Sequence, residues 1–284
     1  MADGGIARYY DRLNRWNAIA RLVGYGGGRD QLTVHRALAD PMAEGRATAS
    51  RLHDVLVQHL PALSSPRVLD AGCGLGGTML LLAERCGASV VGLTLSESQA
   101  ATARAAIAAA GRGATVSVLV QSYDAPPPGP FDLVIAVESL VHSPEPAVTV
   151  RALVSVLAPG GLLAVVDDMP DPAAHGTADL AAFKRGWRSP VVWTREQYLS
   201  AFSALGLELQ HDLDLSAEVR PRSLARINLL ERLNRFVRAA LPFAGVREVM
   251  DSHMGGLSLE RMSRRGLMRY RLLIARRPPS HLFH

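Results

Sequence analysis

The sequence predicts an α/β fold, a doubly wound seven-stranded, mostly parallel sheet with N-terminal helices and a helical insertion before the last strand. Three observations predict it. Five short apolar runs alternate with helical stretches, a glycine-rich turn joins the first run to a helix, and two further runs follow. The 284 residues would allow two domains, but one unbroken series favours a single core with helical additions.

Residues 1–60 are predicted to form a helical cap. Apolar residues recur at helical spacing from Ile6 to Leu22 and again from Thr48 to Leu60. Between them, GYGGGRD at residues 24–30 predicts a flexible or tightly turned loop.

The core is predicted to cover residues 61–278. Its first five strands are expected at RVLDAG (67–72), SVVGL (89–93), TVSVLV (115–120), FDLVIAV (131–137) and GLLAVVD (161–167). Continuously apolar runs of this length are typical of strands buried on both faces. Helices are expected between them, for example over 96–110 and 147–157.

The last two runs are GLELQHDLDL (206–215) and LMRYRLLIA (267–275), which are expected to pair antiparallel. Residues 216–262 lie between them, contain the helical pattern SLARINLLERLNRFVRAAL, and are predicted to form a lid over the site. Residues 279–284 are expected to be a tail.

Composition excludes two classes of protein. Hydrophobic residues make up 48% and charged residues 20% of the chain, which is unlike a disordered protein, and no apolar run is long enough to span a bilayer. The N-terminus has no apolar segment of the secretory type, so a cytoplasmic location is expected. Cys73 and Cys86 form neither a disulfide framework nor a zinc motif.

Charge is unevenly distributed. Residues 220–284 contain 14 Arg and 4 acidic residues, a net charge of +10, whereas residues 1–219 carry −5. A basic segment of this kind suits nucleic acid, an anionic membrane surface, an anionic substrate or simply solvent.

The strongest motif follows the first predicted strand and opens a helix. It reads Asp70-Ala71-Gly72-Cys73-Gly74-Leu75-Gly76-Gly77. The glycines allow a tight turn, and a helix N-terminus offers N–H groups to a ligand. The spacing also fits a dinucleotide-binding turn, but the acid expected at the end of the second strand is missing, and Thr94 follows that strand instead.

The DxGxGxG pattern resembles motif I of class I S-adenosylmethionine-dependent methyltransferases. PFDLVIAVESLVH and Leu157-Ala158-Pro159-Gly160-Gly161 resemble the fourth-strand motif and the turn before strand five of the same superfamily. GLTLSESQ, ESxxH and the N-terminal Tyr9-Tyr10-Asp11 resemble the sterol, tocopherol and prenyl-diphosphate C-methyltransferase branch.

The resemblance implies S-adenosylmethionine as cofactor. The residues expected to bind it are Tyr10, Asp70, Gly72, Cys73, Gly74, Gly76, Thr94, Gln99, Tyr123 and Asp124. Thr94 departs from the many relatives that carry an acid at this position. Gln99 is a candidate replacement for the missing ribose contact, and a plain surface position on a helix is the alternative for it.

Glu138 and His142 are the candidate catalytic residues. Glu138 follows the fourth strand at the edge of the sheet where ligands bind, and a helical turn would place His142, four residues on, beside it. The resemblance implies that Glu138 stabilises a substrate carbocation or accepts its proton; helix capping is the alternative. For His142 a structural role is equally open.

The expected substrate is a small, anionic and lipophilic molecule. Arginines of the insertion favour a prenyl diphosphate, which would be bound by several such contacts or through a bridging Mg²⁺. His35, Arg36, Arg222 and Arg226 are the candidate substrate-binding residues. The leading hypothesis is therefore C-methylation of an isoprenoid alkene, and the runner-up is O- or N-methylation of a small natural product.

Nucleic acid and a membrane surface are two other partners that a basic segment could bind. Nucleic-acid binding is disfavoured because the sequence has no interleaved aromatic platform and no recognisable RNA-binding appendage, and the rest of the chain is acidic. An Arg-rich amphipathic helix over 223–241 would suit peripheral association with anionic lipid. No integral membrane segment is expected, and homo-oligomer formation stays open, as does any metal site.

Overall fold

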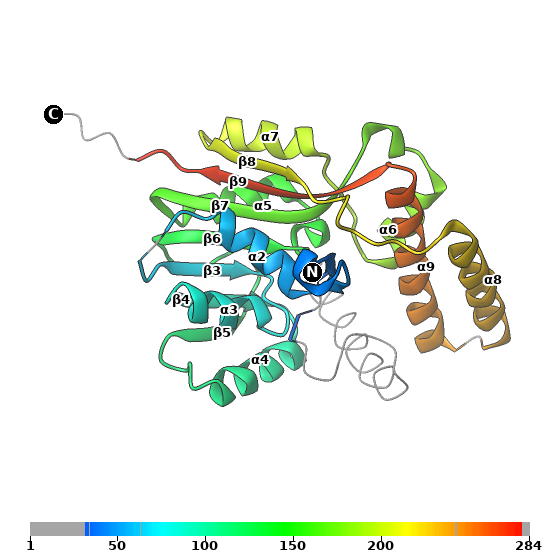
Figure 1. The fold of residues 1–284 in the computed structure, drawn as a ribbon, viewed down its shortest axis with the longest axis horizontal. Coiled ribbons are helices and arrows are strands. Elements are labelled where there is room, and N and C mark those ends of the chain that lie inside the picture. The colour runs from blue at the N-terminus through cyan, green and yellow to red at the C-terminus, as the bar shows by residue number, and fades with distance from the viewer. Residues whose placement is uncertain (1–31, 34, 63, 242, 280–284) are drawn as a thin grey trace.

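The computed structural model describes residues 32–33, 35–62, 64–241 and 243–279. Within these ranges a seven-stranded sheet has the order β5-β4-β3-β6-β7-β9-β8, with helices on both faces (Figure 1). Its strands are β3 (Arg67–Ala71), β4 (Ser89–Thr94), β5 (Val116–Val120), β6 (Phe131–Val137), β7 (Leu157–Pro170), β8 (Glu208–Asp214) and β9 (Met268–Arg276). Each strand overlaps one predicted apolar run, and the predicted fold class is confirmed.

Strands β3 to β7 pair in parallel, whereas β9 lies antiparallel between β7 and β8. The antiparallel pairing expected for the last two runs is therefore confirmed. β7 is longer than predicted. A continuous ladder with β9 runs from Leu162 to Pro170, which extends β7 beyond the apolar run that predicted it.

The hydrophobic core is divided between the two faces of the sheet, because alternate residues of a strand point to opposite sides. On one face Val68 packs with residues of α2 (Ser50–His59), α3 (Gly77–Arg85) and α4 (Glu97–Ala109). On the other face Leu69 packs with residues of α5 (Pro146–Ser155) and α7 (Arg195–Ala204). Burial on both faces explains why the runs lack polar alternation.

A short hairpin precedes α2 and was not predicted. Strands β1 (Leu38–Ala39) and β2 (Ala47–Thr48) pair antiparallel around the 3-10 helix η1 (Pro41–Ala43). Asp40 stabilises the turn by accepting hydrogen bonds from the Met42 N–H and the Thr48 hydroxyl, both at 2.9 Å. The predicted helix over 6–22, the loop over 24–30 and residues 280–284 lie outside the described residues.

Helices α6 (Ala178–Gly186), α8 (Leu224–Ala240) and α9 (Ala244–Arg264) lie beyond the carboxyl ends of the parallel strands (Figure 1). The predicted helical insertion between the last two strands is confirmed, as α8 and α9. α6 and α9 approach closely, because a Cβ on Gly186 would lie 2.3 Å from the Asp251 carbonyl oxygen. Across the described ranges, no helix combines the length and apolar character that crossing a membrane requires.

Candidate active site

The glycine loop joins β3 to α3 at the carboxyl edge of the sheet. The N–H groups of Gly72 and Cys73 both donate to the Leu93 carbonyl, at 3.0 and 2.8 Å, which ties the loop to the end of β4. Gly72, Gly74 and Gly76 have φ values of 104°, 53° and 90°. These left-handed conformations favour glycine, so the motif is explained by the backbone path of the loop.

Asp70 begins this loop with an uncompensated carboxyl group. The side chain is 2% exposed, and its Oδ2 atom has no hydrogen-bond partner within the described part of the chain. Burial raises the pKa of Asp70 to about 7. A buried acceptor without a donor is costly and indicates a place for a ligand N–H or O–H group.

The predicted cofactor residues beyond the glycine loop lie at the end of β4, on α4 and in the loop after β5. Thr94, at the end of β4, donates from its hydroxyl to Oε1 of Gln99 at 2.8 Å, and both side chains are buried. Gln99 therefore does not lie on the helix surface. After β5, the Tyr123 hydroxyl donates to the Ser139 carbonyl at 3.3 Å, and Asp124 accepts from the Thr149 hydroxyl.

Glu138 directly follows β6, and its turn is fixed against the glycine loop. Glu138 has a left-handed φ of 50°, and its N–H donates to the Val166 carbonyl at 2.7 Å. The next residue, Ser139, donates from its hydroxyl to the Ala71 carbonyl at 2.6 Å. A Cβ on Gly72 would lie 2.4 Å from the Ser139 Cβ, so this close approach requires glycine.

Four side chains form one polar group, which we call the Glu138 cluster: Glu138, Arg36, Asp168 and Tyr270. Oε1 of Glu138 accepts hydrogen bonds from the Tyr270 hydroxyl at 2.7 Å and from the Arg36 backbone N–H at 2.8 Å. The Arg36 guanidinium donates to Asp168 Oδ2 at 2.8 Å and lies 5.5 Å from the centroid of the Tyr270 ring.

Burial shifts the pKa values of two members of this cluster, Asp168 and Tyr270. Burial raises the pKa of Asp168 to about 6; the Arg36 charge opposes this rise and the Glu138 charge adds to it. Burial, followed by the charge of Glu138, raises the pKa of Tyr270, so its hydroxyl stays protonated and donates. The cluster thus combines two carboxyl groups with one guanidinium.

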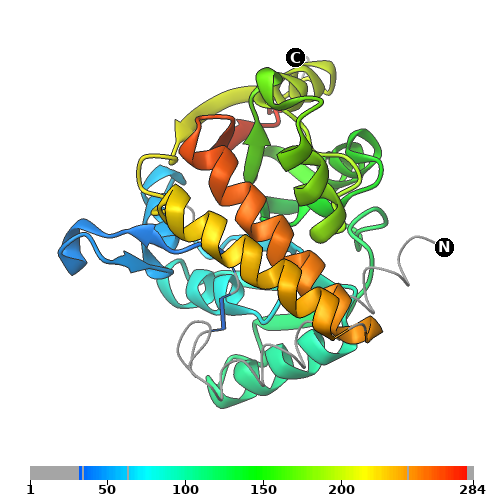
Figure 2. The same cartoon turned by 90° about the vertical axis from the view of Figure 1, so that its right-hand side faces the viewer.

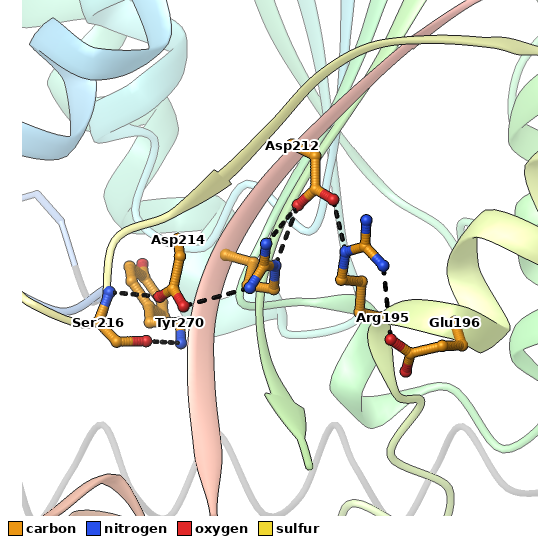
Figure 3. A network of polar contacts seen from close by, with 7 residues as sticks. Arg195, Glu196, Asp212, Asp214, Ser216 and Tyr270 are labelled. Carbon is orange, nitrogen blue, oxygen red and sulfur yellow. Dashed lines mark hydrogen bonds and ion pairs between the residues drawn. The ribbon is translucent and has the colours of Figure 1, made fainter. Parts of the chain in front are cut away.

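Tyr270 is held in place by the chain that follows β8 (Figure 3). Its N–H donates to the Ser216 hydroxyl at 3.0 Å, and its carbonyl accepts from the Leu215 N–H at 2.8 Å. The N–H of Ser216 in turn donates to Asp214 Oδ1 at 2.9 Å. Further along the strands, Asp212 accepts from Arg195 and Arg271, which ties β8 to both α7 and β9.

His142 ends the 3-10 helix η2 (Leu140–His142) and is buried. Burial lowers its pKa to about 4, opposed by hydrogen bonds to the backbone of Arg188 and Trp187. The expectation that a helix would place His142 beside Glu138 is wrong. Glu138 has a left-handed φ and only one 3-10 turn follows, so helical i, i+4 spacing does not apply. The two side chains have separate contacts.

The candidate substrate residues lie in different places. His35 forms a 3.1 Å hydrogen bond with His53 of α2, which anchors the segment that brings Arg36 to Glu138. Arg222 donates to Glu260 of α9 through its N–H at 2.9 Å and its Nε at 3.0 Å, so its charge supports the insertion. Arg226 is exposed on α8. Substrate binding by these residues stays a prediction.

Comparison with known proteins gives the family. A methyltransferase-domain model matches residues 68–161. Methyltransferase GfsG of Streptomyces halstedii is 30% identical over 226 residues, 76% of this chain and 77% of that protein. The 27-O-demethylrifamycin SV methyltransferase of Amycolatopsis mediterranei is 30% identical over 250 residues, 84% of this chain and 87% of that protein. The chain belongs to the S-adenosylmethionine-dependent methyltransferases.

The predicted resemblance is thus confirmed, and rice sterol C-methyltransferases are also relatives of this methyltransferase. A solved geranyl diphosphate C-methyltransferase from Streptomyces coelicolor, in complex with Mg²⁺, geranyl diphosphate and S-adenosyl-L-homocysteine, superposes with a TM-score of 0.71. The two share 18% identity, and the match covers 97% of each chain. At this identity the likeness establishes the fold alone.

The residues of the methyltransferase fit its cofactor. The unpaired Asp70 oxygen before the glycine loop suits a donor such as the ammonium of the methionyl group. Thr94, at the end of the adjacent strand, is hydrogen-bonded to Gln99 in the first turn of α4. When bound, the cofactor supplies an electrophilic methyl group on a sulfonium. Cys73 is a buried residue of the loop itself, and burial raises the pKa of its thiol; cofactor binding by Cys73 stays a prediction. Tyr10 lies outside the described residues.

Sequence reasoning missed Tyr270 and Asp168. Asp167-Asp168 is a pair of acids at the end of an apolar run, which is an unusual signal that could have indicated a polar site. Asp167 turned out to accept the Val141 N–H at 2.9 Å and so to hold η2. Tyr270 gave no comparable signal, because a single tyrosine is ordinary in a strand.

Proposed function

We propose that this methyltransferase methylates a hydroxyl oxygen of a natural product, with Glu138 as the proton acceptor. The observation that carries the proposal is the position of Glu138, a partly exposed carboxylate at the carboxyl end of β6 whose turn is packed on the glycine loop. Both donors that Glu138 binds among the described residues use Oε1, which leaves Oε2 to accept a substrate hydroxyl.

The proposed reaction is a direct transfer of the methyl group from sulfur to the substrate oxygen. Glu138 takes the hydroxyl proton as the substrate oxygen forms a bond to the methyl carbon, and the carbon–sulfur bond breaks with its electron pair going to sulfur. Alignment of the two reactants is expected to supply most of the rate enhancement. A positioned base typically adds a further factor of about 100 to 10,000.

Two observations support an oxygen acceptor without a diphosphate. A relative that matches 84% of this chain at 30% identity is named as the 27-O-demethylrifamycin SV methyltransferase, a name that indicates an oxygen acceptor. The Glu138 cluster carries two carboxylates against one guanidinium, a poor environment for a diphosphate, and the Arg222 charge is engaged by Glu260.

C-methylation of an isoprenoid diphosphate is the second candidate. It is supported by the fold likeness to geranyl diphosphate C-methyltransferase and by the exposed arginine at 226. Here Glu138 would stabilise a carbocation and take its proton. The residues do not fit a Mg²⁺ site of their own: the described ranges contain no group of three metal-ligating side chains, and Asp168 is paired with Arg36. Any Mg²⁺ would have to be held chiefly by the diphosphate.

The deciding experiment uses labelled S-adenosylmethionine and two acceptor panels. One contains hydroxylated macrolactones, ansamycins and phenols; the other contains isopentenyl, geranyl and farnesyl diphosphates, each with and without Mg²⁺. A methoxy product from the first panel supports the proposal. Methyl transfer to an alkene carbon of a diphosphate replaces it with the second candidate.

The role of Glu138 is tested separately with Glu138→Gln. We expect turnover to fall by about 100-fold or more with cofactor affinity unchanged. Glu97→Gln is the matched control, because Glu97 is an exposed acid on α4. Unchanged turnover in E138Q, with a loss in His142→Asn, would transfer the role of base to His142.

A further inference from the structure

Helix α8 carries an apolar surface that is largely exposed. Leu229, Leu233 and Phe236 are 63%, 57% and 70% exposed, and their i, i+4, i+7 spacing aligns them along one side of the helix. We call these three residues the α8 ridge. Phe243, just beyond the helix, is 69% exposed. Contiguous exposed apolar residues of this size usually mark a binding surface.

The opposite side of α8 accounts for its attachment to the protein. Ile227 is fully buried, and the Asn234 amide donates to the Met250 carbonyl of α9 at 3.0 Å. Glu231 pairs with Arg261 of α9. Figure 2 shows α8 in front of α9, on the outside of the molecule. The α8 ridge is therefore not the face that holds the helix in the fold.

The charges around the ridge are basic. Arg226 and Arg232 lie three residues before and after Leu229, so helix geometry places one on each side of the ridge, and both are exposed. The acid of this helix, Glu231, is directed toward Arg261 and Arg235 and does not offset them. The surface thus combines an apolar centre with a cationic border.

We propose that the α8 ridge docks on an anionic lipid surface. Leucine and phenylalanine side chains would enter the interface between headgroups and acyl chains, while the long stems of Arg226 and Arg232 let their guanidinium groups reach lipid phosphates. The net charge of +10 on residues 220–284 adds long-range attraction, whereas the −5 on residues 1–219 favours orienting this face toward the membrane.

A second copy of the chain is the less suitable occupant. A two-fold symmetric contact would bring Arg226 and Arg232 of one copy close to the same residues of the other. With Glu231 directed toward α9, like charges would face each other across the contact. Anionic lipid has the complementary charge.

The test is flotation of the full chain with vesicles of phosphatidylcholine alone or mixed with phosphatidylglycerol. We expect binding to the anionic vesicles, weakened by salt, and little binding to neutral ones. L229S/L233S/F236S should abolish it. R226Q/R232Q should reduce the partition coefficient roughly 10- to 30-fold, since each arginine near an anionic surface contributes about three- to fivefold.

Matched controls are Met42→Ser and Arg151→Gln, which alter exposed side chains on η1 and α5 and should leave binding unchanged. Thermal melting and cofactor binding check that each variant is folded. Absence of binding to anionic vesicles, or equal losses in the control variants, would overturn the proposal. A concentration-dependent dimer that is lost in the L229S/L233S/F236S variant would also overturn the proposal, since the α8 ridge would then bind a second copy of the chain. None of these outcomes depends on the methyl acceptor.

Discussion

The hydroxyl of Tyr270 donates a 2.7 Å hydrogen bond to Oε1 of Glu138. This bond joins the last strand of the sheet to the turn after β6, which itself packs on the glycine loop. The carboxylate is therefore positioned by a residue 132 positions away in the sequence. A hydrogen bond to a charged group contributes about 1.5–3 kcal/mol, enough to influence where the carboxylate rests.

Tyr270→Phe should lower kcat by roughly 10- to 100-fold, because Glu138 loses one of the two donors that orient it. Cofactor affinity should stay unchanged. Steady-state kinetics and calorimetric titration of S-adenosylmethionine measure the two effects. Tyr198→Phe, a buried tyrosine on α7 among residues of the other face of the sheet, is the control. A normal kcat in Y270F would show that the bond has no part in turnover.

Gly72→Ala should destabilise the protein by about 2 kcal/mol or more, because the new Cβ would overlap Ser139 and the φ of 104° is unfavourable for alanine. Ser139→Gly in the same chain removes the overlap and should restore part of the loss. Denaturant unfolding of the two single variants and the double variant measures this coupling. Strictly additive effects would contradict the contact.

Asp70→Asn should change how stability depends on pH. The native pKa of about 7 lies above the ordinary 3.8, so between these values the native state holds a proton that the unfolded state has lost. Raising the pH therefore lowers the free energy of unfolding of the wild type, and D70N escapes this loss.

The free energy of unfolding of D70N relative to wild type should consequently rise between pH 4 and 7, by on the order of 3 kcal/mol without cofactor. Other buried carboxyl groups are shared by both proteins and cancel in the difference. Urea unfolding at several pH values provides the measurement. A difference that stays flat would mean that Asp70 is ionised in the native state.

Arg222→Gln and Glu260→Gln should each lower the melting temperature, and a double-mutant cycle should give a coupling of about 1 kcal/mol, since the pair is only partly buried. The reason is that Arg222 fixes the chain before α8 to α9. Arg226→Gln, an exposed arginine on the same insertion, is expected to leave stability unchanged. Zero coupling would mean that Arg222 does not stabilise the insertion.

The strands and the glycine loop were predictable because their signals are local. Val68 and Leu69 pack on opposite faces of the sheet. Because both faces are buried, consecutive residues of the strand are apolar, and such a run can be recognised in the sequence. The position of Glu138 followed from a general rule about the carboxyl ends of parallel strands.

The partners of Glu138 were not predictable, because they depend on pairing between distant segments. Tyr270 reaches the site because β9 pairs with β7 in a register that places it opposite Asp168. Arg36 arrives through a segment tied to α2 by the contact between His35 and His53. The expected pairing with His142 failed because a left-handed residue interrupts the assumed helix.

The placement of β9 between β7 and β8 has a consequence for protein synthesis. Until the ribosome has added residues 268–276, β8 has no hydrogen-bonded neighbour in the sheet, and Glu138 lacks its tyrosine donor. Folding during translation can complete β3 to β7 early, since N-terminal parts of a chain emerge first. The nascent chain would therefore form its glycine loop well before the hydrogen bond between Tyr270 and Glu138.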